Sequence, residues 1–173
     1  SQFDAFSSWR GDAFGALIGF AGLYQSAQNQ PDTDQPDIGS WTADLTLDFG
    51  GANLFVAGVG RTLDPSMGRS DQFGLVAQGG VFLLDALELF ARYEWGDSGD
   101  DAPDLSVITV GANVFFNRNG LKWTTDIGYG INPVSPFWAS GLYGAGTSSI
   151  GWLPDAPDED GQVVVRTQLQ LMF

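Results

Sequence analysis

The stretch Trp41-Thr-Ala-Asp-Leu-Thr-Leu-Asp-Phe49 alternates apolar and polar residues without a break. Successive side chains of a β-strand point to opposite faces, so this alternation places tryptophan, alanine, leucine and phenylalanine on one face. The threonines and aspartates fall on the other face. We therefore predict a strand that separates an apolar surface from a polar one.

The same period of two recurs in three further stretches, at residues 87–95, 121–129 and 163–173. Weaker strands, several of them apolar or glycine-rich on both faces, are predicted at residues 13–24, 53–61, 72–82 and 105–116. This gives about eight strands, each near the 9–11 residues that a tilted strand needs to cross a bilayer.

Composition supports a membrane setting without helical spans. The 173 residues include 24 Gly, 13 Phe and 6 Trp but only 16% charged residues, whereas soluble domains carry about 25%. Near the N-terminus, the longest run without charge or amide covers residues 13–24, short of the roughly 20 that a spanning helix needs. Mean hydropathy is −0.02, as expected when lipid-facing and lumen-facing side chains alternate.

The predicted connections alternate in length. Short turns are expected at residues 50–52, 84–86 and 117–120, and longer acidic links at 25–39, 62–71, 96–104 and 131–161. Such alternation is typical of outer-membrane barrels, whose short turns lie on the periplasmic side. Aromatic residues then fall near both membrane interfaces: Tyr24, Trp41, Tyr93, Trp95 and Tyr129 toward the loops, and Phe49, Phe116, Trp123 and Phe173 toward the turns. A soluble β-sandwich is the alternative that this regularity disfavours.

The polar faces of the strands carry the candidate pore-lining residues. These are Asp44, Asp48, Glu88, Arg92, Glu94, Lys122, Asp126, Arg166 and Gln168. In a wide pore their acidic excess would favour cations. In a narrow barrel the charges would have to pair across the lumen, because an unpaired buried charge is costly.

Several function classes are disfavoured by composition. The chain has no Cys and no His, which removes disulfides, thiol nucleophiles and histidine acid–base chemistry, so we predict neither catalysis nor a cofactor. A net charge of −14 disfavours nucleic-acid binding. Carboxylates gather in two predicted loops, and solvated loops are favoured there over a Ca²⁺ or Mg²⁺ site; the residues are Asp97, Asp100, Asp101, Asp104, Asp155, Asp158, Glu159 and Asp160.

The C-terminal half carries a family resemblance. The closing stretch Val165-Arg-Thr-Gln-Leu-Gln-Leu-Met-Phe173 resembles the signal read by the outer-membrane barrel-assembly machinery. The stretches Leu89-Phe-Ala-Arg-Tyr-Glu-Trp95, Val107-Ile-Thr-Val-Gly-Ala-Asn113, Leu121-Lys-Trp-Thr-Thr-Asp-Ile-Gly-Tyr129 and 161–171 resemble the last strands of the phosphate-selective porin O/P-like family. That resemblance implies a water-filled pore in a chain about twice as long or longer. Phosphate selectivity is not carried over, because 7 basic residues face 21 acidic ones.

We therefore predict an all-β fold, an antiparallel transmembrane β-barrel formed by residues 1–173 as one domain. The chain is either the C-terminal part of a larger barrel of roughly 16 strands or a complete small barrel. In the first case residues 1–6 end a preceding strand and residues 7–12 form a short turn; in the second they are a periplasmic tail.

The expected function is an outer-membrane porin for passive diffusion of small hydrophilic solutes or ions, favouring cations. The alternative is a closed eight-stranded barrel with a structural, adhesive or assembly role and no channel. Expected partners are outer-membrane lipid and lipopolysaccharide, the barrel-assembly machinery through the strand ending at Phe173, and further copies or a larger membrane assembly. The C-terminus is expected on the periplasmic side. Loop aromatics at 131–161 are expected to pack against another surface, namely Phe137, Trp138, Tyr143 and Trp152.

Overall fold

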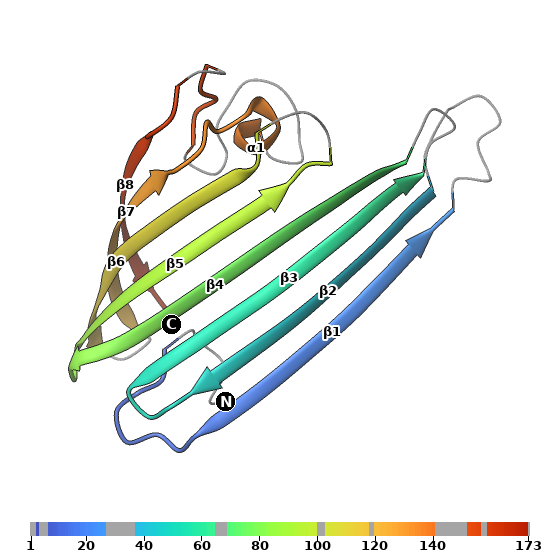
Figure 1. Cartoon of the computed structure of the whole chain (residues 1–173). Helices are drawn as coiled ribbons and strands as arrows, with labels where there is room; N and C mark the ends of the chain where they lie inside the picture. The colour runs from blue at the N-terminus through green and yellow to red at the C-terminus, as the bar shows by residue number, and fades with distance from the viewer. Residues whose placement is uncertain are drawn as a thin grey trace.

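A computed structural model describes residues 3, 7–26, 37–64, 69–99, 103–117, 120–140, 152–156 and 159–172. Within these ranges eight strands form one antiparallel sheet, in which neighbours in sequence are neighbours in space (Figure 1). The strands are β1 (Gly15–Gln25), β2 (Asp37–Asp48), β3 (Ala52–Asp64), β4 (Ser70–Leu84), β5 (Leu87–Asp97), β6 (Leu105–Asn117), β7 (Leu121–Gly130) and β8 (Val163–Leu171). A short helix, α1 (Pro136–Ser140), precedes β8. The predicted all-β architecture of eight antiparallel strands is confirmed.

The strands extend beyond the alternating stretches that predicted them. Strand β2 begins at Asp37 rather than Trp41, because residues 37–40 pair with β3 up to Asp37 opposite Asp64. Strand β4 reaches 15 residues. Ladder hydrogen bonds satisfy the backbone whatever the side-chain pattern is, so pairing continues past the apolar alternation.

The turn between β2 and β3 shows why a short connection was predictable. Gly50 and Gly51 have φ angles of 68° and 127°, a region that residues with a Cβ rarely adopt. The turn is closed by the Phe49 amide, which donates to the Ala52 carbonyl at 2.8 Å. Two glycines in succession therefore fix this hairpin locally.

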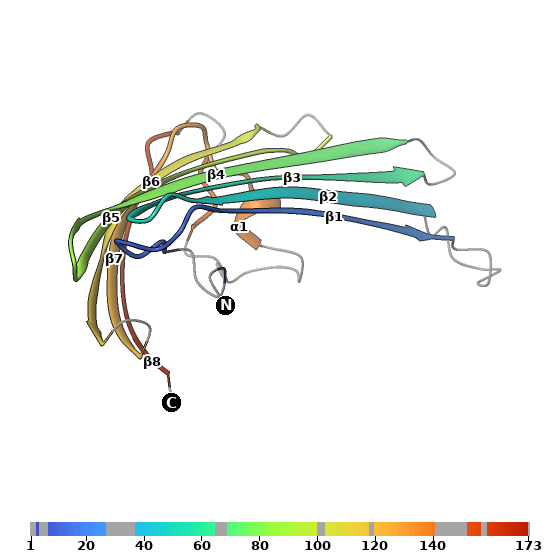
Figure 2. The same cartoon turned by 90° about the horizontal axis from the view of Figure 1, so that it is seen from below.

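The sheet is curved and open. In Figure 2 strands β1–β4 lie nearly flat, while β5–β8 bend round, and α1 lies on the concave side. Among the described residues, β1 pairs with β2 and β8 pairs with β7, and the two outer strands do not pair with each other. The closed eight-stranded form weighed from the sequence is therefore not the arrangement in this structure.

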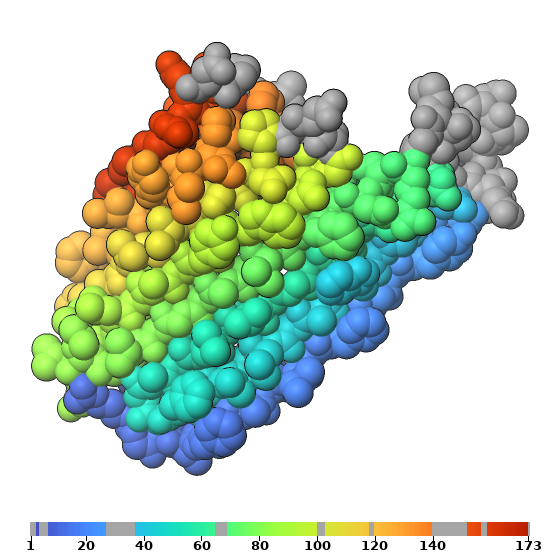
Figure 3. All heavy atoms as spheres, in the orientation of Figure 1, coloured from blue at the N-terminus to red at the C-terminus, as the bar shows by residue number. Residues whose placement is uncertain are grey.

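The two faces of the sheet have opposite characters. We call the concave side the inner face and the convex side the outer face; Figure 3 shows the outer face as a continuous surface over the strands. Large apolar side chains of the outer face are exposed, for example Ile18 at 79%, Phe20 at 78% and Val165 at 69%. The others include Tyr24, Trp41, Leu75, Val81, Leu89, Ile108, Val110, Trp123, Ile127, Tyr129, Leu169 and Leu171. Within the described ranges no helix has the length and apolar character needed to cross a membrane.

Candidate functional site

The strand register places all nine predicted pore-lining residues on the inner face. Directly paired residues share a face of an antiparallel sheet, and Asp44 lies opposite Gly19, Glu88 opposite Asn113, and Asp126 opposite Arg166. The period of two then assigns Asp48, Arg92, Glu94, Lys122 and Gln168 to the same face. What these side chains do there differs between the turn end, the middle and the loop end of the sheet.

At the turn end a buried carboxylate organises a polar cluster. Glu88 is 1% exposed. Its Oε1 accepts a hydrogen bond from Asn53 Nδ2 at 2.9 Å, and its Oε2 accepts from Asn113 Nδ2 at 2.8 Å and Ser7 Oγ at 2.9 Å. Thr124 Oγ1 donates to Asn113 Oδ1 at 2.6 Å and so orients that amide. We call Ser7, Asn53, Glu88, Asn113 and Thr124 the Glu88 cluster; its donors offset the cost of burying the carboxylate.

Residues 7–12 cover the turn end of the inner face. The Gly50 amide donates to Ser8 Oγ at 3.0 Å, and Arg10 Nη2 donates to the Phe82 carbonyl at 2.7 Å. The Trp9 ring contacts both Phe82 and Phe115, with centroids 4.9 Å and 4.7 Å away. The turn predicted at 7–12 does exist, closed by the Asp12 amide on the Trp9 carbonyl at 3.0 Å. It lies against the inner face of the sheet, and residues 1–2 and 4–6, for which the end of a preceding strand was one of two predictions, lie outside the described ranges.

This covering segment changes the surroundings of two predicted residues. Glu88 and Asp48 are each 1% exposed, so neither carboxylate faces open solvent at the turn end. The sequence could not indicate this, because the contact between Ser7 and Glu88 joins residues 81 positions apart. Local periodicity carries no information on such a distant contact.

In the middle of the inner face, two ion pairs join residues predicted to line a pore. Arg166 Nε lies 2.8 Å from Asp126 Oδ1, and Arg92 Nε lies 3.1 Å from Glu94 Oε2. Asp44 lies over Gly19, where an added Cβ would collide with its carboxylate. Arg61, opposite Ser40 and Gln72, shares the inner face but was not singled out from the sequence. Residues 54–60 are apolar or glycine on both faces, so the inward side of β3 was not evident.

At the loop end, residues 131–139 and 152–155 fold onto the inner face. Trp138 lies against Gly96, and Trp152 against Gly128. Trp152 packs with Val107, Val134 and Ala139 in a buried apolar cluster. Trp138 and Trp152 therefore pack against the sheet, and the Phe137 ring lies against that of Trp138, with centroids 4.8 Å apart. Tyr143 lies outside the described residues.

A partly open cavity lies between α1 and the inner face of β1–β4. Its volume is about 520 Å³, and its lining is mainly apolar. The lining includes Ala21, Leu23, Thr42, Val59, Arg61, Phe137 and Trp138. The inner face is therefore not uniformly polar, in contrast to the strict partition that the sequence predicted.

Polar partners accompany the aromatics of the outer face. Near the loop end, Trp95 Nε1 donates to Asp104 Oδ2 at 3.3 Å and the Tyr24 hydroxyl donates to Asp37 Oδ2 at 3.0 Å. Near the turn end, Trp123 Nε1 donates to Thr167 Oγ1 at 2.7 Å. An aromatic body with a satisfied polar tip suits a boundary between an apolar and an aqueous phase.

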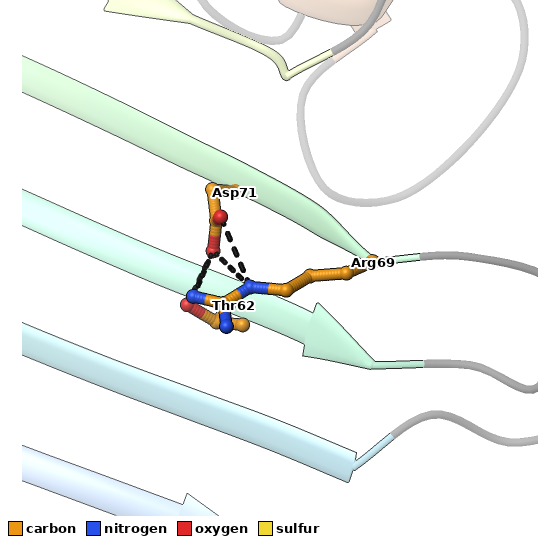
Figure 4. Close-up of polar contacts among 3 residues, drawn as sticks. All are labelled: Thr62, Arg69 and Asp71. Carbon is orange, nitrogen blue, oxygen red and sulfur yellow. Dashed lines mark hydrogen bonds and ion pairs between the residues drawn. The ribbon is translucent and has the colours of Figure 1, made fainter.

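Thr62, Arg69 and Asp71 form a hydrogen-bonded group at the loop end of β3 and β4, on the outer face. Figure 4 shows Asp71 accepting hydrogen bonds from Thr62 and Arg69. The distances are 2.7 Å from Thr62 Oγ1 to Asp71 Oδ1 and 3.0 Å from Arg69 Nε to Asp71 Oδ2. This hydrogen bonding raises the pKa of the exposed Arg69 guanidinium, which stays charged. An exposed ion pair at this position suits surroundings of lipid headgroups or water.

Two of the acidic loop residues that the structure describes accept hydrogen bonds from backbone amides. Asp97 Oδ1 accepts from the Gly99 amide at 2.8 Å, and Asp155 Oδ2 accepts from the Val134 amide at 3.0 Å. The described ranges contain no group of three or more acidic side chains arranged to hold a metal ion. Asp100, Asp101 and Asp158 lie outside them.

A scan against protein-family models finds no match, and searches of curated proteins and of solved structures find no significant match either. The resemblance to the phosphate-selective porin O/P-like family therefore stays a prediction.

Proposed function

We propose that this chain forms the wall of an outer-membrane β-barrel pore that passes small hydrophilic solutes or ions by diffusion and favours cations. The observation that carries the proposal is the contrast between the two faces of the sheet. Monomeric soluble proteins rarely expose contiguous apolar patches larger than a few hundred Å². Here exposed leucine, isoleucine, valine and aromatic side chains extend over strands β1 to β8 on one face, while carboxylates, guanidinium groups and amides lie on the other.

The ends of the strands support the same orientation. Trp95 and Tyr24 with their polar partners lie toward the loops, and Trp123 lies toward the turns. Belts of this kind stabilise a barrel at both membrane interfaces. Arg69 and Asp71 lie near the loop end of β4, beyond the apolar band. We place the turn end, and with it the end of β8, on the periplasmic side.

Charges on the inner face decide which ions would be favoured. Arg92 with Glu94, and Arg166 with Asp126, neutralise each other locally. Asp44 has no ion pair with a described residue, and its side chain is half-buried. We assign the cation preference to Asp44 and to the acidic loops of a chain whose net charge is −14. Focusing by nearby carboxylates raises the local concentration of cations.

The alternative is a structural or adhesive barrel without a channel, as weighed from the sequence. One observation favours it: both ends of the inner face are covered, by residues 7–12 and by residues 131–139 with 152–155. Lipopolysaccharide and outer-membrane lipid remain the proposed surroundings in either case. The barrel-assembly machinery would recognise the closing strand through Phe173, which lies outside the described residues.

Planar-bilayer recording tests the proposal directly. The refolded chain should give discrete conductance steps, and in a KCl gradient its reversal potential should indicate preference for K⁺. Asp44→Asn should reduce the permeability ratio of K⁺ to Cl⁻ about two- to fourfold. A unit charge about 5 Å from an ion in water contributes about 0.8 kcal/mol, with opposite signs for K⁺ and Cl⁻, and screening by salt roughly halves each contribution. The matched control is Asp85→Asn in the exposed turn between β4 and β5. Insertion without any conductance would favour the structural alternative.

A further inference from the structure

The cavity between α1 and the inner face of β1–β4 is a pocket to which the proposed pore assigns no role. Its volume of about 520 Å³ falls in the range of about 300–1,000 Å³ that small-molecule sites occupy. The strand register places most of its floor in two neighbouring rows of inner-face residues. The row nearer the loops is Leu23, Ser40, Arg61 and Gln72, and the row nearer the turns is Ala21, Thr42, Val59 and Gly74.

The charge on this floor comes from Arg61. A second charged residue, Asp97, also borders the cavity, but it lies opposite Phe73, which is exposed on the outer face. Because successive side chains of a strand alternate between faces, the register places the Asp97 carboxylate on the outer face as well. Among the described lining residues, Arg61 is therefore the one whose charged side chain lies on the inner face.

No described carboxylate neutralises this guanidinium group. Arg61 has no hydrogen bond or ion pair with any residue that the structure describes. On the same face, Asp44 lies opposite Ala57, four residues from Arg61 and therefore about 13 Å away along the strand. That separation exceeds the screening length of about 8–10 Å at ordinary ionic strength. Glu94 is already paired with Arg92, at 3.1 Å. The Arg61 side chain is thus available to an anion that enters the cavity.

Aromatic rings form the side of the cavity that faces this floor. The Trp138 ring lies against Gly96, and its Nε1 donates to the Pro103 carbonyl at 3.3 Å. The Phe137 ring stands almost perpendicular to that of Trp138, at an interplanar angle of 89°. Opposite them, the floor offers Val59 and a glycine row. A flat ring between these surfaces would contact aromatic groups on one side and apolar groups on the other, an arrangement that favours aromatic ligands.

We propose that this cavity binds a small monocarboxylate with an aromatic body. Arg61 would hold the carboxylate, because the guanidinium fork fits two carboxylate oxygens at once. Ser40 and Gln72 flank Arg61 on the neighbouring strands, and their hydroxyl and amide groups can donate further hydrogen bonds. The ring would lie between Val59 and the aromatic residues of α1.

The combination of one positive charge with an apolar lining selects this class of ligand. A cation would be repelled by Arg61. An inorganic anion could pair with Arg61 but would leave the apolar lining without a contact. A neutral aromatic molecule would leave the guanidinium without its partner. The inference goes beyond the proposed function and does not rest on it, since binding in the cavity requires no conduction.

Calorimetric titration of the full-length chain in phosphatidylcholine vesicles tests the site, with 2-naphthoate as the probe. Protein-free vesicles provide the blank for partitioning of the probe into lipid. We expect saturable binding at one site per chain, with 2-naphthamide and inorganic phosphate each at least tenfold weaker. Arg61→Gln should weaken 2-naphthoate binding at least tenfold, because it removes a charge-assisted bidentate contact. Arg69→Gln is the matched control: it removes the same charge from the outer face, where Arg69 pairs with Asp71, and should leave the affinity unchanged.

Two further variants keep the test independent of any damage that Arg61→Gln does to the fold. Arg61→Lys keeps the charge but lacks the fork and should weaken binding severalfold. Val59→Phe keeps Arg61 but fills part of the cavity and should weaken binding at least tenfold. Each variant is compared only after its unfolding midpoint matches that of the parent chain.

Equal affinities of Arg61→Gln and Arg69→Gln for 2-naphthoate would overturn the proposal, as would 2-naphthamide binding as tightly as 2-naphthoate. Octanoate binding as tightly as 2-naphthoate would overturn the choice of an aromatic body. Conductance recorded from the same samples is a separate measurement, so a chain that conducts without binding the probe refutes this inference alone. A chain that binds the probe without conducting leaves this inference supported and refutes the pore.

Discussion

Replacing Glu88 by Gln tests whether a buried carboxylate fixes the N-terminal segment to the sheet. The carboxylate accepts from three donors, on Ser7, Asn53 and Asn113, at 2.8–2.9 Å. Glutamine keeps the size of the side chain and one acceptor oxygen. Its N–H₂ group, however, takes the place of one carboxylate oxygen and faces the donors that this oxygen accepted from. One or two of the three hydrogen bonds are therefore lost, and at least one donor is left without an acceptor.

The expected loss follows from the bonds removed. Hydrogen bonds to a charged group contribute about 1.5–3 kcal/mol each, and an unsatisfied buried donor adds a desolvation cost. The Ser7 hydroxyl can rotate to another acceptor, whereas the Asn113 amide is held by Thr124. We therefore expect Glu88→Gln to lower the free energy of unfolding by about 2–5 kcal/mol. Glu94→Gln is the matched control, since its ion pair is about a third exposed, and pairs of that kind contribute about 0–1 kcal/mol.

Reversible guanidinium unfolding in phosphatidylcholine vesicles measures both variants, with tryptophan fluorescence as the signal. Trp9 lies on the segment that Glu88 holds, so its emission should shift toward longer wavelength in Glu88→Gln before global unfolding. Equal midpoints for Glu88→Gln and Glu94→Gln would refute the assignment of Glu88 as the anchor. A large loss of stability without any change at Trp9 would show that the cluster stabilises the sheet but not the covering segment.

Three further substitutions test separate parts of the structure. Gly80→Ala should destabilise by about 1–3 kcal/mol, because its Cβ would lie 2.7 Å from Glu88 Oε1; Gly79→Ala, with its nearest contact at 3.5 Å, should cost much less in the same unfolding assay. Trp138→Ala should raise single-channel conductance, since it removes a ring from the inner face; unchanged conductance would mean that α1 does not narrow the path. Arg69→Gln should leave the unfolding midpoint unchanged, because this ion pair is exposed; a clear drop would assign it a structural role.

Most of the sheet could be predicted from local patterns. Alternation at 41–49 and the two glycines at 50–51 fix a strand and a turn through interactions within a few residues. The same period assigned Asp44, Arg92 and Asp126 to one face, and the register agrees. A slip of one residue would have moved every side chain to the opposite face, so the agreement is informative.

What covers the inner face could not be predicted in this way. The aromatic content of residues 131–161 suggested packing, but nothing in the sequence identified Gly96 and Gly128 as the surfaces that receive Trp138 and Trp152. In the sequence, a glycine on a polar face only interrupts the alternation of side chains. In the fold, it leaves room for the ring of a tryptophan from another segment. Arg61 was missed for a related reason, because residues 54–60 of β3 are apolar or glycine on both faces and do not show which face is polar.

The covering segments alter what decides the width of a pore. From the sequence, the number of strands is the feature that distinguishes a wide pore from a narrow barrel. In the structure residues 7–12 lie over the turn end, and α1 with Trp152 lies over the loop end, so the open polar surface is the band between them. That band contains Asp44 and the two ion pairs, Arg92 with Glu94 and Arg166 with Asp126. A solute would therefore pass these charges whatever the number of strands, and side chains attached to the wall, rather than the wall itself, would determine the narrowest point.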